Sequence, residues 1–169
     1  MSHTLIVLRH AKSDWPAGVA DHRRPLSERG TADAAAAGRW LVDHDAVPQL
    51  AVVSPAQRTR RTWELAAGAL PAPVPVHFDD AVYEADWTDL LEVVRTLPED
   101  VEVAIMVGHN PGSEELATRL AGRGSDAEAL ARMAIKYPTA GLAVLDVDET
   151  WAQVEPGSAR MRSFAVPRG

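Results

Sequence analysis

The sequence predicts a three-layer α/β/α fold with a mostly parallel central sheet and a C-terminal edge strand. Short apolar runs recur along the chain, amphipathic helical segments separate them, and the composition suits one domain over residues 1–169. The chain has 169 residues, of which 46% are hydrophobic and 24% charged, and domains commonly contain about 100–200 residues. A chain of this size can bury a substantial core.

Four apolar runs have the near-continuous Leu, Ile and Val content of parallel strands that are buried on both faces. They are residues 5–8 (LIVL), 50–53 (LAVV), 101–107 (VEVAIMV) and 142–147 (LAVLDV). Residues 74–78 are a weaker strand candidate, and the prolines around them favour a place near a sheet edge. The tail 158–164 alternates small or apolar residues with arginines, which indicates a last strand with one solvated face.

Helical patterns lie between these strands. Ser27 is a candidate N-cap for a helix that extends to residue 43 through an alanine-rich centre. The further helical segments are 57–69, 87–97, 113–121 and 127–136. Pro138 must end the last of them. The alternation of strands with helices is the pattern of a doubly wound α/β sheet.

The composition argues against several classes of function. The 17 Lys and Arg against 24 Asp and Glu give a net charge of −7, which disfavours binding to nucleic acid or anionic membranes. The absence of cysteine excludes thiolate nucleophiles, disulfides and cysteine-based metal sites. No apolar run approaches the length of a membrane span, and the N-terminus lacks a signal-peptide pattern. We therefore expect a cytoplasmic protein with no nucleic-acid or membrane partner.

Polar and charged residues follow the carboxyl ends of four predicted strands, which is where such sheets bind ligands. These residues are 9–13 (RHAKS), 54–58 (SPAQR), 83–84 (YE) and 108–112 (GHNPG). Taken singly, each has an ordinary interpretation as part of a solvated loop, a helix cap or a helix surface. Because all four segments should meet at one edge of the sheet, a joint site is the better interpretation.

The types of residue at this edge suggest a phosphate site. Helix N-termini attract anions, and Arg9 and Arg58 can each form paired hydrogen bonds with phosphoryl oxygens. A neutral histidine is a nucleophile near pH 7, and a second, protonated histidine would stabilise charge on the phosphoryl oxygens. The sequence contains no Walker A loop, no Gly-x-Gly-x-x-Gly motif and no metal-binding histidine spacing. We therefore expect neither a metal ion nor a cofactor.

Residues 5–16, LIVLRHAKSDWP, resemble the Arg-His signature of the histidine phosphatase superfamily, also called phosphoglycerate mutase-like. Four further segments resemble its other landmarks in order: RPLSERG (24–30), SPAQRTRRT (54–62), VYEA (82–85) and VGHNPG (107–112). The resemblance covers residues 4–146, and the short length is most similar to that of the SixA-type phosphohistidine phosphatases. It implies a phosphoglycerate mutase-like fold and a metal-independent phosphatase that forms a phosphohistidine intermediate.

The resemblance also implies roles for individual residues. His10 would be the nucleophile, and Arg9, Arg58 and His109 would complete the phosphate pocket. Glu84 falls where many members of the superfamily carry the general acid that protonates the leaving group. Members of the SixA type are less uniform at that position.

Several residues near the expected site have two interpretations. Ser13 would add a hydrogen bond to the phosphoryl group. Lys12 and residues 22–24 should lie in a loop beside the pocket, where Lys12 and Arg23 either steer an anionic substrate or are simply solvated. Trp15 forms either a platform for the substrate or a cover for the core. Thr139 is interpreted as a turn residue.

The length of the chain favours one substrate class. Phosphoglycerate mutases and sugar bisphosphatases carry insertions that cover the pocket, whereas residues 58–109 leave little chain for a lid. An open pocket suits phosphohistidine on a protein, so we expect a phosphorylated protein or a small phosphorylated molecule as the partner. The alternatives are a nucleotide or small-molecule phosphomonoesterase, a non-catalytic phosphate-binding module, and an interaction protein without a phosphate site. No oligomeric state is predicted.

Overall fold

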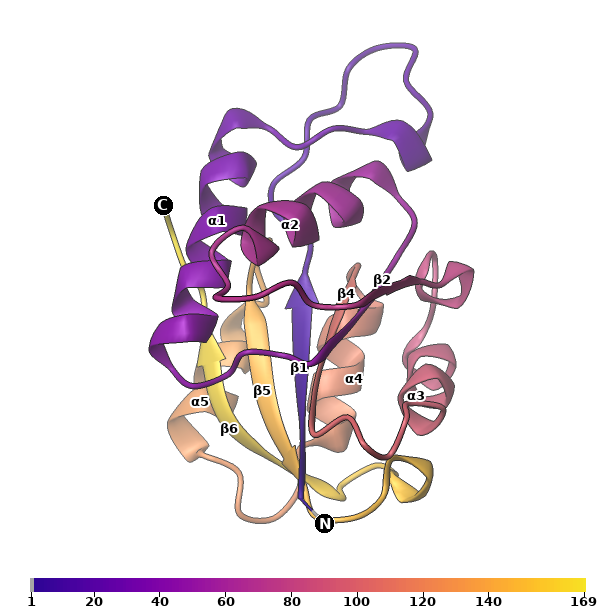
Figure 1. Ribbon diagram of the computed structural model, residues 1–169, viewed down its shortest axis with the longest axis vertical. Helices are drawn as coiled ribbons and strands as arrows, with labels where there is room; N and C mark the ends of the chain where they lie inside the picture. Colours follow the sequence, from indigo (N-terminus) through magenta and orange to yellow (C-terminus); the bar gives the residue numbers. More distant parts are fainter. Residues whose placement is uncertain (1) are drawn as a thin grey trace.

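The computed structural model describes residues 2–169, which fold around a six-stranded sheet (Figure 1). The strands are β1 (His3–Arg9), β2 (Leu50–Val53), β3 (Val76–Phe78), β4 (Val103–Gly108), β5 (Leu142–Val147) and β6 (Ala159–Ala165). Their order across the sheet is β3-β2-β4-β1-β5-β6. The first four strands in this order are parallel to one another, and the C-terminal strand lies at an edge, as predicted.

One strand runs against the prediction. The run 142–147 was expected to be parallel, but β5 is antiparallel to both β1 and β6. The reason is that two helices follow β4, and together they return the chain to the edge at which β1 ends. There the backbone N–H of Ala140 donates to the carbonyls of Arg9 and His10, and the Arg9 N–H donates to the Gly141 carbonyl. From that position the next strand can only run back down the sheet.

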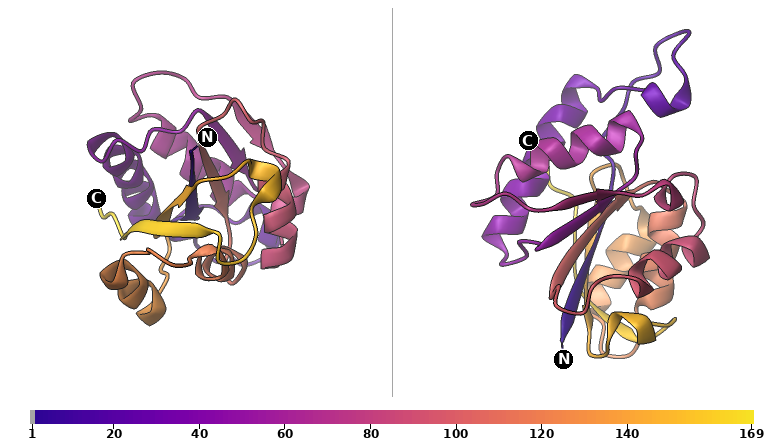
Figure 2. Two further views of the ribbon diagram at one scale, coloured as in Figure 1. Left: turned by 90° about the horizontal axis from the view of Figure 1, so that it is seen from below. Right: turned by 45° about the vertical axis from the view of Figure 1, so that its right-hand side comes forward.

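Helices cover both faces of the sheet, which gives the predicted three layers (Figure 2). One face carries α1 (Glu28–Asp43) and α2 (Gln57–Ala67), and the other carries α3 (Trp87–Arg95), α4 (Gly112–Leu120) and α5 (Ala127–Ile135). Alternate residues of β1 supply the two cores: Ile6 and Leu8 face α1 and α2, while Leu5 and Val7 face the opposite layer. All four are fully buried, so β1 is the centre of the hydrophobic core.

Local sequence signals set the beginnings of two helices. The Ser27 hydroxyl accepts a hydrogen bond from the Gly30 N–H at 3.0 Å, which makes Ser27 the N-cap of α1, as predicted. Asp86 and Asp89 form a reciprocal capping box at the start of α3. The lack of a side chain at Gly30 is also required, because a Cβ there would lie 2.0 Å from the Lys12 carbonyl oxygen. That close approach holds α1 against the segment that follows β1.

The segment between β1 and α1, residues 10–27, extends beyond the carboxyl edge of the sheet, at the top of Figure 1. We call it the β1–α1 loop. It contains a 3₁₀ turn over Asp21–Arg23 and is closed on itself by an antiparallel bridge between Ser13 and Leu26. Among the described residues, none of the helices combines the length and apolar character that crossing a bilayer requires.

Candidate active site

A cavity of about 250 Å³ lies at the carboxyl edge of the sheet, where β1 and β4 end and α2 begins. It is lined by Arg9, His10, Lys12, Ser13, Trp15, Arg24, Arg58, His109, Asn110 and Thr139. The structure therefore brings five of the six predicted site residues around one cavity. The sixth, Glu84, lies elsewhere.

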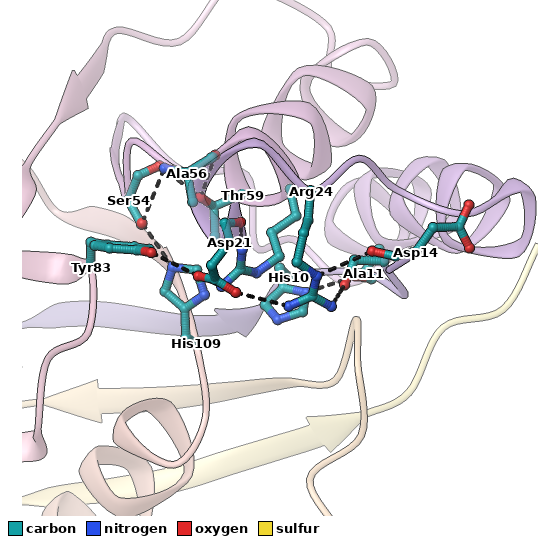
Figure 3. A network of polar contacts seen from close by, with 12 residues as sticks. His10, Ala11, Asp14, Asp21, Arg24, Ser54, Ala56, Thr59, Tyr83 and His109 are labelled. Carbon is teal, nitrogen blue, oxygen red and sulfur yellow. Dashed lines mark hydrogen bonds and ion pairs between the residues drawn. The ribbon is translucent and has the colours of Figure 1, made fainter. Parts of the chain in front are cut away.

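His10 follows β1 directly and is only 8% exposed. Its Nδ1 lies 2.7 Å from the backbone carbonyl oxygen of Ala11 (Figure 3). Since a carbonyl can only accept, Nδ1 carries the proton and the lone pair of Nε2 stays free. Burial lowers the pKa of His10 to about 3, with the nearby His109, Arg58 and Arg9 adding to the effect. At neutral pH the ring is therefore uncharged, with the lone pair of Nε2 free.

The backbone around His10 is held from α2. The Ala11 N–H donates to the hydroxyl of Thr62 at 3.0 Å, and that hydroxyl donates to the Arg58 carbonyl at 2.6 Å. His10 N–H itself donates to the Gly108 carbonyl of the neighbouring strand. The imidazole thus stands on backbone fixed by both the sheet and α2.

His109 follows β4, and its ring centroid lies 5.4 Å from that of His10. Its Nε2 lies 2.8 Å from the Ser54 hydroxyl, as Figure 3 shows, while its Nδ1 is buried without a hydrogen-bond partner. Burial, followed by the nearby Arg58 guanidinium, lowers the pKa of His109 to about 4. The residue pattern predicts a protonated second histidine, but in the free protein this ring is neutral near pH 7.

Each of the two predicted arginines, Arg9 and Arg58, donates hydrogen bonds from its terminal guanidinium nitrogens and has no partner at Nε. Arg9 donates from Nη1 to the Tyr137 carbonyl at 2.9 Å. Arg58 donates from its two terminal nitrogens to the backbone and side-chain oxygens of Asp21 at 2.7 and 3.0 Å. The Nε atoms of both arginines are buried without partners. Together with Nδ1 of His109, three buried nitrogens of residues that line one cavity lack a hydrogen-bond partner, which is typical of an anion site.

The β1–α1 loop contributes two charged residues that sequence reasoning did not assign to the site. Arg24 is 7% exposed and donates to the hydroxyl of Ser13 at 2.6 Å and to the Asp14 carbonyl at 3.1 Å. Asp21 accepts hydrogen bonds from Arg24, Arg58 and the Tyr83 hydroxyl. The Tyr83 hydroxyl, together with the two guanidinium groups, holds the pKa of Asp21 well below its usual range.

Ser13 and Glu84 differ in position. Ser13 lines the cavity and is only 5% exposed; because its oxygen accepts from Arg24, its proton remains available to a bound anion. Glu84 is exposed and lines a separate surface hollow with Asp79 and Asp89. The structure therefore does not bring Glu84 together with the other predicted residues.

The sequence contains only partial signals for the cavity residues that were not predicted as part of the site. Arg24 opens the quoted segment RPLSERG, but an arginine in a loop has no pattern that predicts burial. Thr139, interpreted as a turn residue, and Asn110 also line the cavity. Residues 2–169 contain no group of three or more His, Asp or Glu side chains arranged to hold a metal ion.

Comparisons with known proteins agree with this geometry. The family model for the histidine phosphatase superfamily (branch 1) matches residues 5–134. The uncharacterised protein Rv1276c of Mycobacterium tuberculosis is 40% identical over 162 residues, which cover 95% of this chain and all of that protein.

Two solved structures provisionally named phosphohistidine phosphatase SixA are also similar. The one from Nakamurella multipartitia has a TM-score of 0.86 at 28% identity and covers 99% of this chain and 97% of its own. The one from Agrobacterium tumefaciens has a TM-score of 0.82 at 30% identity and covers 98% of each chain.

Proposed function

Because this chain belongs to the histidine phosphatase superfamily and is a phosphatase, we propose that it hydrolyses phosphohistidine on a partner protein, with His10 as its nucleophile. One observation carries the proposal: three buried nitrogens, Nε of Arg9, Nε of Arg58 and Nδ1 of His109, lack acceptors around the cavity that holds His10. A phosphoryl group brings three oxygens that can accept from them.

In the proposed mechanism, Nε2 of His10 attacks phosphorus as the bond between phosphorus and the leaving nitrogen breaks, and the leaving ring, protonated on its other nitrogen, departs as neutral imidazole. The hydrogen bond from Nδ1 to the Ala11 carbonyl orients the ring and supports the positive charge that develops on it. Arg9 and Arg58 neutralise the three equatorial oxygens, and the Ser13 hydroxyl donates to one of them. Water then attacks phosphorus, which releases inorganic phosphate and restores His10.

His109 has two tasks in this proposal. The Ser54 hydroxyl accepts from the Ala56 N–H, so its own proton is free to be donated to Nε2 of His109. The imidazole proton then resides on Nδ1, which can donate to a phosphoryl oxygen. A bound phosphate dianion would also raise the pKa of His109 from its low value, because a nearby negative charge favours the protonated ring. Protonation would then accompany substrate binding.

The proposed substrate class rests on the leaving group. Imidazole is a good leaving group, so phosphohistidine places little demand on a general acid, and no carboxylic acid lines the described cavity. The role of Glu84 as a general acid stays a prediction. Phosphomonoesters with alkoxide leaving groups would need such an acid. The composition of the cavity therefore favours phosphohistidine over nucleotides and sugar phosphates.

The test compares the wild-type protein with His10→Ala and with a control, His77→Ala, which removes an exposed histidine. We expect His10→Ala to lower turnover of a phosphohistidine peptide by roughly 10⁴-fold and to abolish the acid-labile phosphoenzyme in a quench experiment, whereas His77→Ala should retain both. An undiminished phosphoenzyme in His10→Ala would refute the proposed nucleophile.

A panel of phosphohistidine peptide, nucleotides and sugar phosphates tests the substrate class. The highest kcat/KM on a nucleotide or a sugar phosphate would assign the small-molecule alternative.

A further inference from the structure

Trp15 lies on the β1–α1 loop and lines the same cavity as His10, yet its side chain is 76% exposed. Because Trp15 lines the cavity, its exposed indole is available to contact whatever the cavity binds. The high exposure excludes the interpretation of Trp15 as a cover for the core.

The indole is nevertheless held in place. The guanidinium carbon of Arg24 lies 3.3 Å from the ring centroid, which is a stacked cation–π contact. Arg24 is itself fixed by hydrogen bonds to Ser13, Asp14 and Asp21. A buried, multiply bonded arginine therefore supports one face of the ring, and the other face remains open to solvent.

The size of the cavity limits what reaches this open face. A volume of about 250 Å³ suits a phosphoryl group at its base, against the buried His10 and Arg58, but not a whole phosphorylated side chain with its peptide. The group attached to phosphorus must therefore extend out through the mouth of the cavity, where Trp15 and the exposed Lys12 lie. A planar aromatic ring there can stack on indole, whereas an aliphatic chain presents no face to it.

We propose that Trp15 is a specificity residue whose open face stacks against a planar leaving group, so that the enzyme prefers phosphoryl groups carried on aromatic rings. Resting on the proposed function, this inference names the imidazole of phosphohistidine as the ring. The charged groups of the cavity bind the phosphoryl group of the substrate, and the flat face of Trp15 selects the planar ring that carries it. Arg24 contributes as a positioning residue because it holds the indole at the mouth.

The experiment compares Trp15→Ala and Trp15→Phe with the wild-type protein on two peptides of identical sequence. One peptide carries phosphohistidine and the other phospholysine, so both present a P–N bond but only one presents a ring. We expect Trp15→Ala to lower kcat/KM about 10-fold on phosphohistidine, mainly through KM, and to change it less than about 2-fold on phospholysine. Trp15→Phe, which keeps a ring, should stay within about 3-fold of wild type on both.

An equal loss on both peptides would overturn the proposal, since it would mean that Trp15 acts only on the structure of the loop. No loss on either peptide would overturn it as well. Thermal denaturation of each variant establishes that the fold is intact.

A matched pair of phosphotyrosine and phosphoserine peptides separates this inference from the proposed substrate. If the wild-type protein releases no phosphate from phosphohistidine, the proposed function fails, but the stacking inference is still tested by the ratio of kcat/KM on these two peptides. A ratio that Trp15→Ala leaves unchanged would overturn it there too.

Discussion

The cavity has two walls that are built in different ways. The strand-end wall consists of Arg9, His10, Arg58 and His109. Arg9 ends β1, His10 and His109 follow β1 and β4, and Arg58 lies in the first turn of α2, so their backbones are fixed by the sheet or by a helix. The loop wall consists of residues 12–24 of the β1–α1 loop, most of which are exposed. The proposed nucleophile is thus on rigid backbone, and the surface proposed to meet the rest of the substrate is on a loop.

The two walls also differ in how their polar groups are satisfied. On the strand-end wall three buried nitrogens have no acceptor. On the loop wall, by contrast, Asp21 and Arg24 form ion pairs: Asp21 accepts from Arg24 and Arg58, and Arg24 also donates to the Ser13 hydroxyl. This difference indicates that the strand-end wall is prepared for an anion, while the ion pairs of the loop wall hold the loop in position.

Substitution on the strand-end wall should give the largest effect. We expect Arg58→Lys to lower kcat/KM on any substrate by roughly 30- to 100-fold, because a single ammonium cannot both bind Asp21 and donate to phosphoryl oxygens. Steady-state kinetics measure this loss. Arg61→Lys on the exposed side of the same helix is the matched control and should be neutral. A loss of less than about 3-fold in Arg58→Lys would place the phosphoryl group elsewhere.

The pH behaviour of His10 and His109 tests whether the strand-end wall is as strongly buried as its contrast with the exposed loop wall requires. Burial lowers the pKa of His10 to about 3 and that of His109 to about 4, so both rings should stay neutral at pH 5, where an unperturbed histidine is roughly 97% protonated. NMR titration of the imidazole resonances in the free protein measures this. Because the unfolded chain takes up these protons below about pH 6.5 and the folded chain does not, the free energy of unfolding should fall as the pH drops from there toward 4. Midpoints near 6.5 would contradict the burial argument.

The smallest effect is expected outside both walls. Since Glu84 is exposed and does not line the cavity, Glu84→Gln should change kcat/KM on a phosphohistidine peptide by less than about 3-fold. The same variant assayed on a phosphomonoester tests the general-acid prediction. A loss of tenfold or more on the ester alone would support that role, whereas a loss on both substrates would require Glu84 to reach the cavity when substrate binds.

Most of the fold could be predicted because apolar runs report burial on both faces of a sheet. The runs at residues 5–8 and 50–53 became central strands, and Pro71, Pro73 and Pro75 correctly indicated that the weaker strand β3 lies at an edge. The direction of β5 could not be read in this way, since an apolar run looks the same in either direction. The two successive helical segments before it were the available signal, because a second helix reverses the direction in which the chain re-enters the sheet.

The strand-end residues could be listed together from sequence because the topology alone brings strand ends to one edge. Arg24 and Asp21 could not, because their positions depend on how an eighteen-residue loop, residues 10–27, folds back on the cavity. No periodicity governs such a loop, and its geometry depends on contacts such as that of Asp21 with Tyr83, 62 positions away.

The hydrogen bond between Nδ1 of His10 and the Ala11 carbonyl fixes which isomer the phosphoenzyme would be. Under the proposed mechanism the phosphoryl group is attached to His10 through Nε2. If the partner histidine is phosphorylated at its own Nε2, the P–N bond that breaks is of the same kind as the P–N bond that forms. The exchange between the two imidazoles is then close to thermoneutral and runs in both directions. Hydrolysis becomes the only step that commits the phosphoryl group, so the admission of water to the cavity governs whether that group is released as phosphate or returned to the partner.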